Sequence, residues 1–427
     1  MKKSRYNYIS AISDSCSLIY NTASDKIVLL SNELVSLFTN DNQSCDLIRK
    51  IHPVFFQELV FGEMLVPDDV NEYENMVNHL LLEQEQSNPI HITINPTLDC
   101  NFRCWYCYEE HLQGSCMTID MLDAIQRLLL KIIQQDSQRR IVISFFGGEP
   151  LLYYTKIVKK IITYIKDVNK AYGRIIDFYM TSNGYLLTEK VINDLKNIDC
   201  YVDFQIPIDG AEYFHDKIKF LSSGQGTYAK VLRNIKYAVQ NKFPVTVRCN
   251  YTNDSIESFR EVADDFIQYT SFENLEFKFH RVWQEKNTKL LQNKLKGVVE
   301  YFTEAGLRSD DNVGSKGLCY ADKRDSVVIN YNGELYKCTA RNFDKTNCIG
   351  LLNSDGELIF NDRYYERLDC KYKSKQCADC IIFPICMQTC SQNVIEVKDD
   401  ICVAQNTPEY CEQIIRKRLR KITNYEF

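Results

Sequence analysis

The sequence of 427 residues lacks long apolar runs and carries no excess of positive charge. A membrane-spanning helix needs about 20 consecutive apolar residues, and no stretch here approaches that length. The first residues lead into polar sequence instead of the apolar core of a signal peptide, so we expect a cytoplasmic protein with no membrane partner. Because nonspecific nucleic-acid binding needs clustered Lys and Arg, the net charge of −6 argues against a nucleic-acid partner.

Cysteine, by contrast, is abundant, with 18 residues. Disulfides are rare in the reducing cytosol, so metal binding or catalysis is the better expectation for these side chains. Most of them fall into two groups, near residues 100–107 and from residue 319 onward. Five stand alone without a neighbour at ligand spacing, and we interpret them as small buried hydrophobes: Cys16, Cys45, Cys116, Cys200 and Cys249.

The apolar patterns divide the chain into three blocks. Residues 1–88 predict short strands followed by helices, as in a winged-helix-like module. The expected strands are Tyr6–Ile12, Cys16–Tyr20 and Lys26–Leu30, with helices beginning near Asn32 and Val70. The polar segment Glu83–Pro89 is interpreted as a linker.

Residues 89–310 alternate strand and helix patterns, which predicts an α/β fold with a parallel sheet and right-handed crossovers. The expected strands are His91–Asn95, Ile141–Phe146, Ile175–Met180, Tyr201–Pro207, Val245–Asn250 and Leu275–His280. The expected helices are Met121–Gln134, Lys156–Tyr172, Glu189–Asn197, Tyr228–Gln240, Ile256–Tyr269 and Thr288–Ala305. Six such units make a partial (β/α)6 TIM-like barrel, whose chemistry belongs on the loops after the strands.

Residues 311–427 show short turns and dense cysteines. We find too little apolar sequence there for an ordinary core, and we expect metal clusters to hold this block together.

The first cysteine group follows the first barrel strand and reads C-x3-C-x2-C, at Cys100, Cys104 and Cys107, with Tyr106 before the last cysteine. Three thiolates on one loop can ligate three irons of a [4Fe–4S] cluster and leave the fourth iron open. Zinc is the alternative, but three close cysteines without a fourth suit its tetrahedral geometry poorly.

The second motif, Gly147-Gly148-Glu149 between Phe146 and Pro150, ends the second strand. Two glycines allow a close backbone approach to a ligand, and the carboxylate can accept hydrogen bonds from an ammonium group. Taken alone, a Gly-Gly-Glu turn is weak evidence, because glycine pairs are common in turns.

Polar residues also end later strands. Ser182 and Asn183 close the third strand, where they can bind a cofactor or simply cap a helix. Arg248 near the end of the fifth strand is either a cofactor ligand or a solvated side chain. The segment Asp209-Gly210 is interpreted as structural.

Together these motifs resemble the radical S-adenosylmethionine (SAM) superfamily. The resemblance implies that Cys100, Cys104 and Cys107 hold a cluster whose open iron binds S-adenosylmethionine, and that one electron cleaves this cofactor to a 5′-deoxyadenosyl radical that abstracts a substrate hydrogen. The expected cofactor-binding residues are Tyr106, Gly147, Gly148, Glu149, Ser182, Asn183 and Arg248.

The second cysteine group closely resembles the SPASM domain, an extension found in radical enzymes that mature peptides and proteins. The resemblance implies two auxiliary [4Fe–4S] clusters, the first with three evident ligands. The implied ligand sets are Cys319, Cys338 and Cys390 for the first cluster, and Cys377, Cys380, Cys386 and Cys402 for the second. A pair of zinc knuckles is the alternative.

Two ligand assignments stay open. The fourth iron of the first auxiliary cluster can bind water, a substrate thiolate, or an extra cysteine such as Cys370 or Cys348. Cys411 competes with Cys402 for the last position, and we favour Cys402.

The resemblance therefore predicts a maturase that forms a thioether or another cross-link in a ribosomally made precursor peptide. The N-terminal block would recognise the leader of that peptide, and a flavodoxin or ferredoxin would donate electrons. One alternative is a formylglycine-forming sulfatase maturase, which Thr339 disfavours because an Asp is expected after the cysteine matching Cys338. Another is an iron–sulfur electron carrier without radical chemistry.

Overall fold

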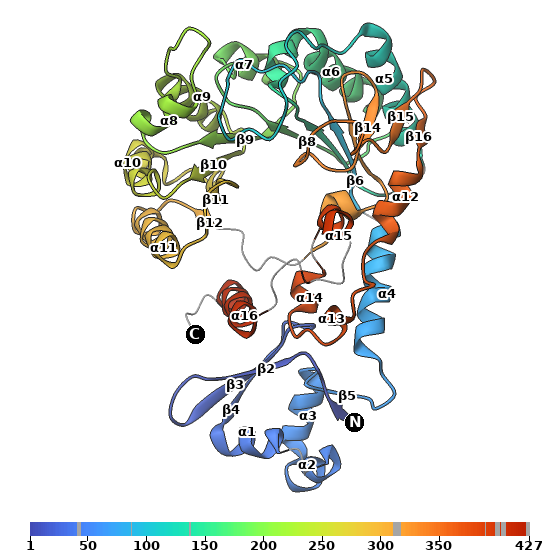
Figure 1. Ribbon diagram of the computed structural model, residues 1–427, viewed down its shortest axis with the longest axis vertical. Helices are drawn as coiled ribbons and strands as arrows, with labels where there is room; N and C mark the ends of the chain where they lie inside the picture. The colour runs from blue at the N-terminus through green and yellow to red at the C-terminus, as the bar shows by residue number, and fades with distance from the viewer. Residues whose placement is uncertain are drawn as a thin grey trace. The chain divides into compact units, whose positions relative to one another are not determined.

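The computed structural model describes residues 1–40, 44–86, 88–135, 138–310, 317–388, 390–397, 402 and 407–423. The chain forms two compact units (Figure 1). Unit 1 comprises Met1–Ser87, Val313–Arg324 and Glu366–Phe427, and unit 2 comprises Asn88–Asn312 and Asp325–Tyr365. The predicted boundary at residue 311 lies outside the described residues, and the functional division into three blocks stays a prediction.

Unit 2 contains a partial TIM-like barrel. Its parallel strands are β6 (Ile90–Ile94), β7 (Ile141–Phe145), β8 (Ile176–Thr181), β9 (Val202–Ile208), β10 (Val245–Tyr251) and β11 (Leu275–Arg281), adjacent in chain order. The helices between and after them are α5 (Ile119–Gln134), α6 (Lys159–Asn169), α7 (Glu189–Asn197), α8 (Glu212–Ile218), α9 (Tyr228–Gln240), α10 (Phe259–Asp265) and α11 (Lys289–Glu304). They lie along the outer side of the curved sheet (Figure 1). The predicted α/β fold class is confirmed.

The hydrophobic periodicities explain these elements. Residues of β9 alternate between buried and half-buried, whereas β7 is buried at four of its five positions, as expected for a sheet covered by helices. In α5, Thr118 accepts a hydrogen bond from the Met121 amide at 3.2 Å and caps the helix. The apolar residues of α5 recur at helical spacing, so one face of the helix packs against the sheet.

The sheet continues beyond the predicted barrel. Its further strands are β12 (Ser309–Asp310), β13 (Ser326–Ile329), β14 (Glu334–Tyr336), β15 (Gly350–Leu352) and β16 (Leu358–Phe360). Strand β13 pairs in parallel with β6, and β14–β16 follow antiparallel. The expectation of too little apolar sequence for an ordinary core after residue 310 is wrong here, because Val328, Ile329 and Leu335 are fully buried.

In unit 1, the described part of the first 87 residues forms two small antiparallel sheets and four helices. The strands are β1 (Lys2–Lys3), β2 (Asn7–Ala11), β3 (Cys16–Asn21), β4 (Ile27–Ser31) and β5 (Leu65–Val66), and the helices are α1 (Asn32–Thr39), α2 (Cys45–Ile51), α3 (Pro53–Phe61) and α4 (Glu72–Glu85). The larger sheet has the order β2-β3-β4, and β1 pairs with β5. Helix α4 includes the first three residues of the predicted linker, which are therefore helical; Ser87 of that segment lies outside the described residues.

The C-terminal helices are α12 (Asp362–Asp369), which begins in unit 2, and α13 (Lys375–Ala378), α14 (Phe383–Cys386), α15 (Ser391–Val397) and α16 (Pro408–Thr423). Of these, α14 and α16 pack against the N-terminal sheet within unit 1. Leu18 and Tyr20 of β3 share a buried cluster with Ile385 of α14 and Ile415 of α16. None of the described helices has the length and apolar character needed to cross a bilayer.

Candidate active site

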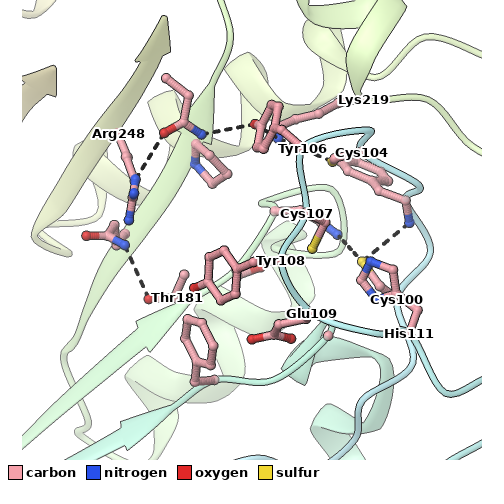
Figure 2. A pocket seen from close by; sticks show the side chains of 18 of the residues that line it. Cys100, Cys104, Tyr106, Cys107, Tyr108, Glu109, His111, Thr181, Lys219 and Arg248 are labelled. Carbon is pink, nitrogen blue, oxygen red and sulfur yellow. Dashed lines mark hydrogen bonds between the residues drawn. The ribbon is translucent and has the colours of Figure 1, made fainter. Parts of the chain in front are cut away.

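Unit 2 contains a cleft at the carboxyl ends of the parallel strands, with a volume of about 160 Å³. The loop after β6, the turns after β7 and β8, and residues of β9, β10 and β11 contribute to its walls. Figure 2 shows the side chains that line it. Because parallel strands end at one edge of the sheet, motifs far apart in the sequence meet here.

The predicted cysteine loop lies at this cleft, and Cys100, Cys104 and Cys107 all line it. The Phe102 amide donates a hydrogen bond to Cys100 Sγ at 3.4 Å, and Asn183 Nδ2 lies 3.8 Å from the same sulfur. Burial raises the pKa of Cys100 to about 12, so iron binding there must displace a proton. The structure thus brings the three predicted thiols together on one cleft.

The glycine turn packs against the backbone of the cysteine loop. Gly147 has φ of +102°, and a Cβ there would lie 2.3 Å from the Thr97 carbonyl oxygen. A Cβ on Gly148 would lie 2.2 Å from the Asp99 carbonyl oxygen, so neither position has room for a side chain. Both glycines line the cleft. Because they have no side chain, the two loops can pack closely and the backbone stays accessible to a ligand.

Glu149 is fully buried beneath the cleft. Its carboxylate accepts hydrogen bonds from the Leu151 amide at 2.9 Å, Ser182 Oγ at 2.9 Å and the Asn183 amide at 2.8 Å. Burial raises the pKa of Glu149 to about 7, while these donors lower it. In this arrangement the carboxylate fixes the turn after β8, and three of its acceptor positions are already used.

Tyr106 belongs to a buried polar network. Its hydroxyl donates to Asp209 Oδ1 and accepts from Lys219 Nζ at 2.7 Å and Asn250 Nδ2 at 3.1 Å. Arg248 Nε in turn donates to Asn250 Oδ1 at 3.0 Å. Two predicted cofactor residues, Tyr106 and Arg248, are therefore linked by one chain of hydrogen bonds along the cleft wall (Figure 2).

Lys219 and Asp209 form the charged centre of this network. Lys219 Nζ lies 2.9 Å from Asp209 Oδ2, and the two side chains are 3% and 1% exposed. Burial by itself lowers the pKa of Lys219, but Asp209, Cys104 and Tyr106 together raise it well above its usual value. A buried charge is tolerated because an opposite charge and polar partners replace its water.

Three side chains of the cleft have polar atoms without a hydrogen-bond partner among the described residues. Glu109 is 8% exposed, and its Oε1 is one such atom; burial raises the pKa of this carboxyl to about 8. Nη1 of Arg281 and Nδ1 of His111 are the others. Unpaired buried polar groups are costly, so the cleft wall is built for a ligand that offers both a donor and an acceptor.

The C-terminal cysteines are divided between the two units. Cys377, Cys380, Cys386, Cys402 and Cys411 belong to unit 1. Burial and the neighbouring thiols of Cys380, Cys377 and Cys402 together raise the pKa of Cys386 to about 11. The four cysteines of the second predicted cluster are thus neighbours.

The cysteines predicted to bind the first auxiliary cluster are distributed over both units. Cys319 and Cys390 belong to unit 1, and Cys338 belongs to unit 2. Of the two candidate extra ligands, Cys370 is in unit 1 and Cys348 in unit 2. Both auxiliary ligand sets stay predictions.

Comparison with protein families identifies the domain that carries the cleft. Residues 94–266 match the model of the radical SAM superfamily, and this segment contains the cysteine loop, the glycine turn and the strands from β7 to β10. The chain carries a radical SAM domain. The superfamily implies a [4Fe–4S] cluster and S-adenosylmethionine.

Two of the relatives with assigned activities align with more than half of this chain. The radical SAM cyclopropyl synthase TigE of Paramaledivibacter caminithermalis is 21% identical over 274 residues, which are 59% of this chain and 55% of TigE. The serine-type anaerobic sulfatase-maturating enzyme of Bacteroides thetaiotaomicron is 22% identical over 359 residues, 72% of this chain and 84% of that enzyme. This chain spans about half the length of several curated relatives that it matches, TigE included.

Among solved structures, SuiB of Streptococcus suis bound to precursor peptide SuiA has the same fold, with a TM-score of 0.53 and 16% identity. The similarity covers 93% of this chain and 97% of the SuiB chain. SuiB has also been solved with S-adenosylmethionine.

The cleft of the radical SAM domain fits the implied cofactors. Among the described residues, no three His, Cys, Asp or Glu side chains are arranged to hold a single metal ion; the three thiols instead line a cleft, as cluster ligands would. S-adenosylmethionine carries an amino and a carboxylate group, which match the partnerless atoms of Glu109 and Arg281 in chemical type.

Sequence reasoning missed Glu109, Lys219, Asn250 and Arg281. One signal was available for Lys219, which is a charged residue within the apolar stretch Ile218–Leu221. No comparable signal marks Glu109, because the adjacent Glu110 is exposed and only the fold distinguishes the two.

Proposed function

We propose that this chain is a radical SAM peptide maturase that forms a thioether or another cross-link in a precursor peptide. Cys100, Cys104 and Cys107 would hold the [4Fe–4S] cluster. When bound, the cluster and S-adenosylmethionine supply a 5′-deoxyadenosyl radical through one-electron reductive cleavage. The proposal includes a cytoplasmic location and a flavodoxin or ferredoxin as electron donor.

The observation that carries the proposal is the composition of the single cleft described above. Three thiols, a glycine turn and three polar atoms without a hydrogen-bond partner among the described residues lie together at the carboxyl ends of the barrel strands. In this cleft the chain's own residues would orient the cofactor: Gly147 and Gly148 leave backbone groups accessible, and Glu109 and Arg281 would bind its amino and carboxylate groups. The hydrogen-bonded wall from Tyr106 to Arg248 would keep this geometry fixed and exclude water.

The similarity to SuiB, which was solved with a precursor peptide, supports a peptide substrate. The N-terminal sheet of unit 1 would recognise the leader segment, because its edge strands β2 and β4 each have one side without a strand neighbour among the described residues. An extended peptide can add to such an edge through main-chain hydrogen bonds. The neighbouring thiols of Cys377, Cys380, Cys386 and Cys402 support an auxiliary cluster in the same unit.

Formylglycine formation is the second candidate, favoured by the alignment over 84% of the sulfatase-maturating enzyme. Thr339, which follows Cys338, argues against it, since a carboxylate base is expected at that position.

Iron and sulfide analysis tests the proposed function. Anaerobically reconstituted protein should contain about three [4Fe–4S] clusters and release 5′-deoxyadenosine when reduced with S-adenosylmethionine. The Cys100/Cys104/Cys107→Ala variant should lose one cluster and all cleavage activity. Cys116→Ala is the matched control and should keep both, because Cys116 does not line the cleft. Cleavage that survives the triple substitution would disprove the proposal.

A further inference from the structure

Lys219 contacts the cysteine loop directly. Its Nζ lies 3.4 Å from Cys104 Sγ, within the distance of a hydrogen bond to sulfur. The same nitrogen donates to the Tyr106 hydroxyl at 2.7 Å and pairs with Asp209 at 2.9 Å. The contacts with Cys104 and Tyr106 are hydrogen bonds (Figure 2), and the contact with Asp209 is an ion pair.

We infer that Lys219 is a positioning residue that raises the reduction potential of the cluster held by Cys100, Cys104 and Cys107. This inference rests on the proposed function, because it needs a cluster at these cysteines. Lys219 acts through Cys104, whose sulfur its ammonium group contacts.

The cluster gains negative charge on reduction. One added electron makes the cluster and its thiolates more negative, so a nearby positive charge stabilises the reduced form more than the oxidised form. Hydrogen bonds to the ligand sulfurs change the potential in the same direction. The interaction is strong because Lys219 is only 3% exposed, and little water screens it.

The surrounding residues keep the ammonium at the sulfur. Asp209 balances its charge, and the Tyr106 ring lies 5.0 Å below Nζ. Asn250 donates to the Tyr106 hydroxyl from β10 and fixes that ring in turn. The lysine therefore cannot turn toward solvent without leaving Asp209 as an unpaired buried carboxylate, which is strongly unfavourable.

The test is a potentiometric titration of the reconstituted enzyme followed by EPR. The relevant cluster is identified as the component of the reduced spectrum that changes on addition of S-adenosylmethionine. Lys219→Met should lower the midpoint potential of this component. Lys219→Arg keeps the charge, so its midpoint potential should lie close to that of the wild type. Lys217→Met is the matched control, because Lys217 is exposed two residues away and contacts Tyr213.

A second pair of variants tests the inference if Lys219→Met does not fold. The Asp209→Asn/Lys219→Met double variant leaves no unpaired buried charge, and its midpoint potential should lie below that of Asp209→Asn alone. A potential in Lys219→Met equal to that of the wild type, or equal potentials in the Asp209→Asn pair, would overturn the inference. A wild-type spectrum with no component sensitive to S-adenosylmethionine would instead refute the proposed function.

Discussion

At the residue scale, Glu109 is a better candidate than Glu149 to bind the amino group of the cofactor. The sequence motif points to Glu149 as the acceptor for an amino group, yet three internal donors already occupy its carboxylate. Glu109 has an oxygen without a described partner and lines the cleft. The position of the motif was predictable from its spacing, whereas the hydrogen bonds of its carboxylate depend on the turn after β8, 33 residues further along the chain.

We expect Glu109→Gln to weaken the binding of S-adenosylmethionine by the reconstituted enzyme by about tenfold, because the amide keeps an acceptor oxygen but loses the negative charge that would pair with the ammonium group, and charge-paired hydrogen bonds are about twice as strong as others. Equilibrium dialysis with labelled cofactor measures this affinity. Glu110→Gln is the matched control, since Glu110 is exposed beside Glu109. Equal affinities of Glu109→Gln and the wild type would remove Glu109 from the binding site.

At the scale of elements, periodicity was a reliable guide where a segment packs against one surface. The predicted helices at α7 and α9 match the observed bounds, because their apolar residues recur at helical spacing and pack on one face. Near Ile256–Tyr269 the predicted helix is broken up: α10 covers Phe259–Asp265, and the flanking Ile256–Ser258 and Ile267–Tyr269 are short 3-10 helices. Strands β13 to β16 were missed because each is only three or four residues long, too short to show a period.

Helix α16 carries Cys411, which competes with Cys402 for the last ligand position. Cys411 is buried with Ile415 and Leu419 in an apolar cluster and hydrogen-bonds to the thiol of Cys380, whereas Cys402 is half-buried beside Cys386. The deeper burial of Cys411 favours a structural role for it. We expect Cys402→Ala to lower the iron and sulfide content. Cys411→Ala should keep the iron and lower the free energy of unfolding by about 1 kcal/mol, as the loss of a small buried group does. Iron analysis and urea unfolding distinguish the two roles, and loss of iron in Cys411→Ala alone would reverse the assignment.

At the scale of the whole molecule, segments distant in the sequence share one core. Residues of the first 87 and of the last 62 pack together in unit 1, for example through the ion pair of Asp25 with Arg418 at 2.7 Å. Local patterns predict the elements of each segment but hold no information on which segments associate, because that choice depends on complementary side chains far apart in the chain. The parallel barrel is the exception, since alternating strands and helices limit its topology.

The stability of the barrel unit should fall in mild acid because of His215. This side chain is fully buried against Thr227 and the Tyr228 ring. Burial lowers its pKa from 6.5 to about 4, a shift that Lys219 increases and that Asp209 and Asp216 oppose. Between these pH values the unfolded chain binds a proton that the folded chain excludes, so the free energy of unfolding decreases as the pH falls from 6.5 toward 4.

Converted with 1.36 kcal/mol per pKa unit, this shift predicts a loss of about 2 kcal/mol between pH 7 and pH 5. Urea unfolding followed by the fluorescence of Trp105 and Trp283, both in unit 2, measures it. His215→Gln removes the titrating group and should flatten the pH dependence by that amount, although its stability at pH 7 is lower. His79→Gln, at an exposed position of α4, should keep the wild-type slope. If His215→Gln loses as much stability between pH 7 and pH 5 as the wild type does, other groups control the acid sensitivity, and the buried neutral histidine has no part in it.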